Sequence, residues 1–256
     1  MRYNGASMKR HTCLLIILLN LASMLMWWDL GWPQTHRDES EQTARYLTML
    51  LDAGRLVVHR NQPLINDPRK GDKGFTPESF EQQVIDEFFR LTSIDLKRPP
   101  AHLPALAKEL LPTFLESSKQ VVADAQLVIN QRGIGYKNFI PATFGSQASR
   151  KFSNRSQVKM KQTTLNPRNL KNTPDAYEEQ VLKRLAAQPV SNDPITEWVD
   201  DGKTLRVLTP IYYSHDCLDC HGNPQGILDI SGYPREGARD GDLAGAISVQ
   251  IPAAIP

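Results

Sequence analysis

The 256-residue chain is organised around one stretch near its end, Cys217-Leu218-Asp219-Cys220-His221. Two cysteines three positions apart, followed at once by a histidine, form the attachment motif of a c-type haem. The spacing has a physical reason, because each thiol can form a thioether with one of the two haem vinyl groups. The histidine then lies beneath the porphyrin, where its imidazole can bind the iron. The sequence therefore predicts one covalently attached haem c, with Cys217 and Cys220 as the tether and His221 as the proximal ligand.

Other kinds of site share this cysteine spacing, namely a structural disulfide, a thioredoxin-like redox pair and half of a zinc site. A zinc site needs a second pair of ligands at suitable spacing, and the sequence holds only three cysteines. A thioredoxin motif begins a helix in a β-α-β unit, whereas this pair follows a β-rich run and precedes the turn sequence Gly222-Asn223-Pro224. Haem attachment is therefore the favoured interpretation, with a disulfide or a chance match as the alternative.

The N-terminal residues predict a targeting segment. Arg2, Lys9 and Arg10 precede an apolar run over residues 13–32, which is close to the ~20 residues that span a bilayer. The pair Trp27-Trp28 is typical of an interfacial aromatic belt, and the small residues of a signal-peptide cleavage site are poorly matched. An uncleaved membrane anchor is therefore favoured over a cleaved signal peptide.

This topology divides the chain into a basic cytoplasmic segment 1–12, a transmembrane helix 13–32, a linker 33–44 and an exported domain 45–256. The positive end stays in the cytoplasm, so we expect a single-pass protein of the inner membrane with its haem domain in the periplasm. The soluble periplasmic form is the alternative. Export agrees with the haem motif, because c-type haem is attached outside the bacterial cytoplasm. Cys13 lies within the apolar segment and is interpreted as inert.

Composition excludes several classes of function. The net charge is only +2, which gives no bulk electrostatic case for nucleic-acid binding. The sequence shows no nucleophile–base pair, no phosphate-binding loop and no second metal cluster, so we do not expect an enzyme. Apolar residues make up 40% of the chain, which is enough for a folded core.

The first part of the exported domain, residues 45–153, has the apolar period of helices. A helix is predicted over 44–65, and Thr76-Pro77-Glu78 has the composition of a helix start. The helix that begins there is predicted to end at Arg98-Pro99-Pro100. A further long helix is predicted over 103–130, with a kink at Pro112.

An internal repeat occupies the same part of the chain. Residues 57–88 recur as residues 121–152 at a constant offset of 64 with no gap, which indicates duplication of a helix–loop–helix unit. We interpret the copies as two packed hairpins. The identical pairs are Val57/Val121, Val58/Val122, Gln62/Gln126, Ile65/Ile129, Asn66/Asn130, Gly71/Gly135, Lys73/Lys137, Phe75/Phe139, Pro77/Pro141, Phe80/Phe144, Gln83/Gln147 and Phe88/Phe152.

The second part, residues 154–256, changes to the period-two pattern of strands. Thr173-Pro174-Asp175 predicts the start of a short helix, and Asp200-Asp201-Gly202-Lys203 is a strong hairpin signal. The chain is therefore predicted to be an α+β protein, with a small antiparallel sheet that has helices on one side. The predicted strands are 157–163, 195–199, 204–213 and 245–251.

Five stretches, taken in order, resemble successive blocks of a known family of exported haem-c-binding domains. The family was long catalogued as a domain of unknown function, and its members occur alone or as sensory heads of histidine kinases and related receptors. The resemblance covers roughly residues 45–251 and implies a PAS-like antiparallel sheet with the haem against it. The blocks are residues 139–145 (FIPATFG), 161–169 (KQTTLNPRN), 208–212 (LTPIY), 217–224 (CLDCHGNP) and 242–249 (DLAGAISV).

The resemblance implies a membrane-anchored sensor, in which the haem reads redox state or a small gas and a partner protein receives the signal. No output domain follows Pro256 in this sequence, which favours the alternative, a monohaem cytochrome that carries electrons between membrane and periplasmic partners. A homodimer is compatible with either function.

The second axial ligand of the iron is left open. Some members of the family supply a cysteine, but the matching position falls near Pro141, with no Cys or Met beside it. His59 is a candidate, although its counterpart in the second repeat is Ala123. Met160 is another, with a core position as its alternative, and so is an open or water-bound iron.

Further candidate haem contacts flank these blocks. Arg168 can bind a haem propionate through two parallel hydrogen bonds, and Lys161 is a weaker candidate for the same role. Tyr212 and Tyr213 precede the tether, and strand alternation turns one of them toward the haem or the core. Tyr212 is included among the candidate contacts.

Overall fold

The computed structural model describes residues 36–254. The chain divides into two units, residues 1–39 and 40–256, and the second holds all the elements named below. The predicted anchor at residues 13–32 lies outside the described residues. Within 36–254, none of the helices has both the length and the apolar character needed to cross a membrane.

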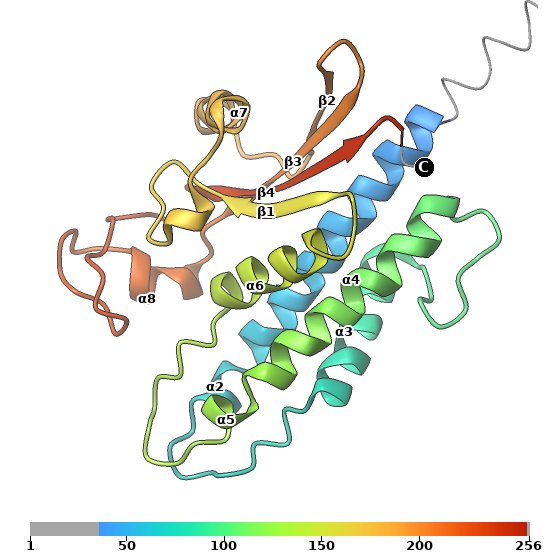
Figure 1. Cartoon of the computed structure of the whole chain (residues 1–256). Coiled ribbons are helices and arrows are strands. Elements are labelled where there is room, and N and C mark those ends of the chain that lie inside the picture. Colours follow the sequence, from blue (N-terminus) through green and yellow to red (C-terminus); the bar gives the residue numbers. More distant parts are fainter. Residues whose placement is uncertain (1–35, 255–256) are drawn as a thin grey trace, which may run out of the picture. The chain divides into compact units, whose positions relative to one another are not determined.

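The predicted helical half is confirmed, and its helices lie together beside the sheet (Figure 1). Their apolar side chains form a common core. Its first helix covers residues 40–60 of this unit and ends before the predicted end at residue 65, because a turn at Asn61 separates it from the short helix that contains Pro63. The helices that follow are α2 Gln62–Ile65, α3 Pro77–Thr92, α4 Ala105–Asp124, α5 Gln126–Ile129 and α6 Pro141–Ser153.

Helix α3 begins where the sequence predicts and ends earlier than predicted. The Thr76 hydroxyl accepts from the backbone amide of Ser79, whose side chain accepts from the Thr76 amide in return. This capping box satisfies two backbone amides that have no partner within the helix. The predicted end at Arg98-Pro99-Pro100 was wrong, because the left-handed backbone of Ser93 (φ 60°) ends the helix earlier.

The two copies of the predicted repeat exchange equivalent hydrogen bonds. Each copy ends its first helix with a glutamine and an asparagine whose side chains reach the loop of the other copy. The four bonds are Gln62 Nε2 to Phe139 O at 2.8 Å, Gln126 Nε2 to Phe75 O at 3.0 Å, Lys137 N to Asn66 Oδ1 at 3.1 Å and Lys73 N to Asn130 Oδ1 at 2.9 Å.

Equivalent phenylalanines of the two copies also pack together in the core. The rings of Phe80 and Phe144 meet edge to face, with centroids 5.2 Å apart. Gly54 allows this approach, because a Cβ at that position would lie 2.7 Å from Cε1 of Phe144. The glycine that lowers helix propensity in the sequence therefore makes room for the second repeat.

The second half is the predicted antiparallel sheet, with four strands in the order β1-β4-β3-β2. The strands are β1 Lys159–Thr163, β2 Ile195–Val199, β3 Thr204–Tyr212 and β4 Leu243–Pro252. The predicted β2–β3 hairpin is confirmed, and its turn places Asp200 and Asp201 at positive φ. Helix α7, Ala176–Ala186, covers one face of the sheet, and strand side chains on the other face join the core of the helical half. The prediction of helices on one side only is therefore wrong, because the strands carry apolar side chains on both faces.

Candidate functional site

The cysteine–histidine motif follows the end of strand β3. The chain forms a short 3-10 turn, η2 His215–Cys217, and then one helical turn, α8 Leu218–His221. Residues three apart in such a turn lie on one side of it, so Cys217 and Cys220 are neighbours with His221 directly after them. Both cysteines are free thiols of intermediate exposure. This arrangement matches the donor set that thioether attachment requires.

A carboxylate fixes the orientation of His221. Its Nδ1 lies 2.9 Å from Oε2 of Glu236, and a carboxylate only accepts hydrogen bonds. We therefore assign the proton to Nδ1, which leaves the lone pair on Nε2. Tyr213 covers the imidazole, with ring centroids 4.8 Å apart and its hydroxyl 3.4 Å from Nδ1.

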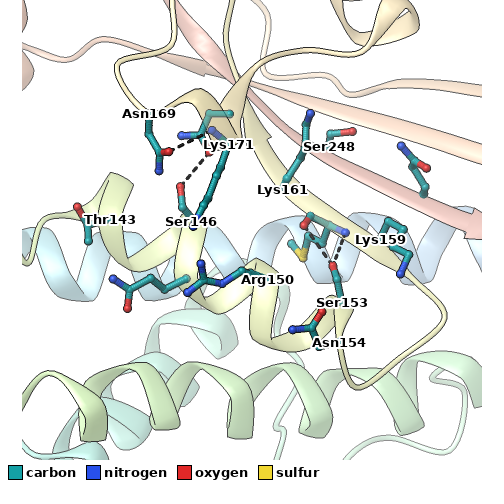
Figure 2. A pocket seen from close by; sticks show the side chains of 14 residues that line it. Thr143, Ser146, Arg150, Ser153, Asn154, Lys159, Lys161, Asn169, Lys171 and Ser248 are labelled. Carbon is teal, nitrogen blue, oxygen red and sulfur yellow. Dashed lines mark hydrogen bonds between the residues drawn. The ribbon is translucent and has the colours of Figure 1, made fainter.

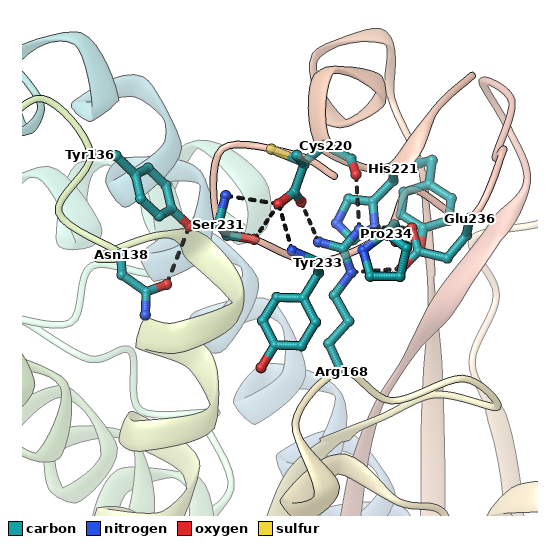
Figure 3. A network of polar contacts seen from close by, with 11 residues as sticks. Tyr136, Asn138, Arg168, Cys220, His221, Ser231, Tyr233, Pro234 and Glu236 are labelled. Carbon is teal, nitrogen blue, oxygen red and sulfur yellow. Dashed lines mark hydrogen bonds and ion pairs between the residues drawn. The ribbon is translucent and has the colours of Figure 1, made fainter. Parts of the chain in front are cut away.

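Arg168 links this histidine to the rest of the loop. Its Nε donates to Oε1 of Glu236 and its Nη1 to Oδ2 of Asp229, each at 2.6 Å. Its Nη2 donates to the carbonyl of Cys220 at 2.9 Å (Figure 3). The Arg168 guanidinium thus links the tether to two carboxylates, that of Glu236, which pairs with His221, and that of Asp229, which is buried.

The charges of this cluster are set by its surroundings. Burial acts to raise the pKa of the Asp229 carboxyl, but hydrogen bonds from Ser231 and Arg168 outweigh it and hold that pKa well below its ordinary range. Burial also acts to raise the pKa of the Glu236 carboxyl, but hydrogen bonds from Arg168 and His221 outweigh it, so that this pKa is lowered. Burial raises the pKa of Tyr213 to about 12. At neutral pH both carboxylates are therefore ionised and the phenol is neutral.

Cys220 does not resemble a reactive thiol. Burial and the charge of Asp229 raise the pKa of its thiol. A raised pKa keeps this thiol protonated at neutral pH.

An exposed apolar surface adjoins the tether. In the loop after α8, the side chains of Ile227, Leu228 and Ile230 are 54%, 65% and 69% exposed. Backbone bonds between Asp229 and Tyr233 hold this loop in a fixed turn. Neighbouring apolar side chains that face solvent mark a surface that binds an apolar group, and a porphyrin is such a group. The residues present therefore fit a haem.

The structure brings some of the other predicted residues to this site. His59, on the helix of residues 40–60, lies with Nε2 3.1 Å from Oδ2 of Asp216, which precedes Cys217. Arg168 is in the cluster, but two carboxylates already pair with it.

The remaining candidates make their contacts elsewhere. The ammonium of Lys161 pairs with Glu178 at 2.8 Å. The Tyr212 hydroxyl donates to the carbonyl of Ser191 at 3.0 Å, so it is Tyr213 that contacts His221. Met160 is buried in the core.

Sequence reasoning missed the two acids that organise the cluster. Glu236 and Asp229 stand in an irregular loop rich in Gly and Asp, where no periodic pattern separates a buried acid from a solvated one. The sequence did offer one signal, because the loop that directly follows the tether carries several apolar residues, which suggests that it contributes to the site.

Comparison with known proteins finds one matching family model and a similar solved structure. Residues 34–252 match the model of the Tll0287-like family, described as Tll0287. Among solved structures the chain is similar to the crystal structure of the cyanobacterial heme-protein Tll0287. The two share 16% identity, the match covers 58% of this chain and 96% of that one, and the TM-score is 0.40. No curated protein sequence matches the chain.

Proposed function

The chain belongs to the Tll0287-like family, and on that premise we propose that it is a monohaem c-type protein. Cys217 and Cys220 form the thioether tether, and Nε2 of His221 binds the iron. The name of the related heme-protein supports a haem in the family. The C-x-x-C-H motif supports its covalent attachment in this chain.

The observation that carries the proposal is the bond between His221 Nδ1 and Glu236 Oε2 at 2.9 Å. Histidines that bind a metal nearly always donate the other ring N–H to a carboxylate, a carbonyl or water, which sets the tautomer and strengthens the ligand. The pairing with Glu236 therefore supports His221 as an iron ligand through Nε2.

A bound haem supplies an iron that changes oxidation state or takes a small gas. The protein's own part is to hold and tune the ligand. Glu236 keeps the Nδ1 proton in place, Arg168 fixes Glu236, and the Tyr213 ring shields the imidazole from water. Two ionised carboxylates, partly offset by Arg168, set the local charge.

The more favoured role is that of a sensor of redox state or of a small gas. The contact between His59 and Asp216 joins the tether to the helix of residues 40–60, and the sequence before this helix contains the proposed anchor at residues 13–32. A change at the haem would therefore act directly on that helix. His59 is also our candidate for the second axial position, and a partner protein would receive the signal.

The alternative role is electron transfer between membrane and periplasmic partners. It is favoured by the partial exposure of Cys217, Cys220 and His221, since an electron carrier needs its haem edge near the surface. Both roles share the proposed inner-membrane location, with the haem domain in the periplasm and a PAS-like arrangement of the sheet.

Optical spectra of the reduced protein, taken with and without CO, separate the two roles. A sensor of gases is expected to bind CO, with a shifted spectrum. A low-spin spectrum indifferent to CO would remove the gas-sensing role and favour electron transfer. If His59 is an axial ligand, His59→Ala will alter the spectrum and ease CO binding, whereas an unchanged spectrum would remove His59 from the iron.

A further inference from the structure

A second site lies along strand β1, the edge strand of the sheet. A groove with a volume of about 700 Å³ runs between helix α6, strands β1 and β4, and the 3-10 turn η1 Leu170–Asn172. None of the residues that line it belongs to the tether cluster. The groove is therefore a separate feature of the fold (Figure 2).

The charge of this groove is entirely positive. Arg150, Lys159, Lys161 and Lys171 line it, and no aspartate or glutamate does. Lys161 is neutralised by Glu178 at 2.8 Å, but the other three cations have no ion pair within the described part of the chain. The whole chain is nearly balanced, with 30 basic and 28 acidic residues, so this concentration is local.

Hydrogen bonds hold the walls of the groove in fixed positions. The Ser146 hydroxyl of α6 donates to Oδ1 of Asn172 at 3.1 Å, which ties the helix to η1. The Ser153 hydroxyl accepts from the backbone amide of Met160 at 2.8 Å, which ties the same helix to β1. The three cations therefore project from a preorganised frame rather than from a mobile loop.

A buried hydroxyl in the groove also lacks a partner. Ser248 of β4 lines the groove and is only 1% exposed. Its Oγ makes no hydrogen bond within the described residues. Buried polar groups are nearly always hydrogen-bonded, so this hydroxyl is available to a polar group bound in the groove.

We propose that this groove binds a small soluble molecule that carries two or more carboxylate or phosphate groups. Cations from three different elements, α6, β1 and η1, surround one space, which suits more than one anionic group. Small-molecule sites typically have volumes of about 300–1,000 Å³, and this one falls in that range. Met160 is the only hydrophobic side chain in the lining, so the ligand is polar throughout. Arg and Lys are the usual partners of such oxyanions.

Calorimetric titration of the full-length chain with tripolyphosphate and with citrate tests this proposal. At least one probe is expected to bind saturably, and the two together show whether phosphate or carboxylate is preferred. Arg150→Gln and Lys171→Gln should each weaken binding by about tenfold, and Ser248→Ala should weaken it less. The matched control is Lys70→Gln with Lys203→Gln, which removes two exposed charges that do not line the groove.

Binding of neither probe would overturn the proposal, and so would equal weakening in the control pair, which would indicate a general charge effect. Neither result bears on the haem, because the groove and the tether share no residue. Haem attachment in Arg150→Gln and Lys171→Gln is expected to match the wild type, and so is their urea unfolding, which shows that these variants fold.

Discussion

Asn66 and Asn130 make equivalent hydrogen bonds, each to the loop of the other repeat copy. The side-chain oxygen of Asn66 accepts from the amide of Lys137, and that of Asn130 accepts from the amide of Lys73. Both lysines are buried, so each asparagine satisfies an amide that solvent reaches poorly. The duplication visible in the sequence is therefore an interface between the two copies, in which each completes the loop of the other.

Asn66→Ala and Asn130→Ala are expected to destabilise the fold by similar amounts, about 1–3 kcal/mol each, because each leaves a buried amide without a partner. Urea unfolding measures the loss. The control is Asn192→Ala, at an exposed position, which should change stability little. A large cost for one asparagine and none for the other would contradict the reciprocal arrangement.

Gly54→Ala is expected to destabilise the protein although alanine favours helices. The added Cβ would lie 2.7 Å from the Phe144 ring, and such overpacking costs about 1–3 kcal/mol. Thermal or urea unfolding checks this value. Phe144→Leu in the Gly54→Ala background should recover part of the loss, whereas strictly additive losses would show that the two positions do not touch.

Arg168→Met is expected to cost about 3–5 kcal/mol of stability, because it leaves the fully buried Asp229 carboxylate unpaired. Adding Asp229→Asn should restore part of it. The control is Arg184→Met, whose pair with Glu197 is largely exposed and worth less than about 1 kcal/mol. Equal losses for the two arginine variants would contradict the proposed organisation of the tether loop.

Glu236→Gln tests the proposed role of Glu236 in tuning His221 as a haem ligand. The variant removes a negative charge beside His221 while it keeps a hydrogen-bond acceptor, so the ferric state should lose stabilisation and the reduction potential should rise. Spectroelectrochemical titration measures the shift, with Glu179→Gln on the exposed face of α7 as the control. An unchanged potential would show that Glu236 does not act on the iron ligand.

The lowered pKa of Glu87 is expected to make the stability of the protein depend on pH in the acidic range. Hydrogen bonds from Arg90 and then Arg60 lower the pKa of this buried carboxyl against the opposing effect of burial. A lowered folded-state pKa contributes stability that is present above the unfolded value of about 4.3 and is lost as the pH falls through the folded pKa. The stability difference between wild type and Glu87→Gln should therefore shrink below about pH 4. A difference independent of pH would contradict this assignment.

Local signals in the sequence were reliable where a few neighbouring residues determine the backbone. The Thr76 cap and the Asp200-Asp201-Gly202 turn are of this kind, and so is the repeat, because identical residues form equivalent contacts. The early end of α3 was missed because Ser93 carries no strong helix-ending signal.

The partners of the candidate site residues were less predictable. Arg168 lies 61 residues before Asp229 and Glu178 lies 17 after Lys161, and only the folded chain decides these pairs. The sequence identified which residues carry the chemistry of the tether. It did not identify Glu236, because the shape of an irregular loop brings that acid to His221.

The proposed covalent attachment of haem through Cys217 and Cys220 is tested by mass spectrometry and haem staining of the denatured chain, produced in a host that matures c-type haem. We expect a chain heavier by one haem that keeps its stain after denaturation, and loss of both signals in Cys217→Ala with Cys220→Ala. A denatured wild-type chain without haem, or a double variant that keeps the stain, would rule out this attachment.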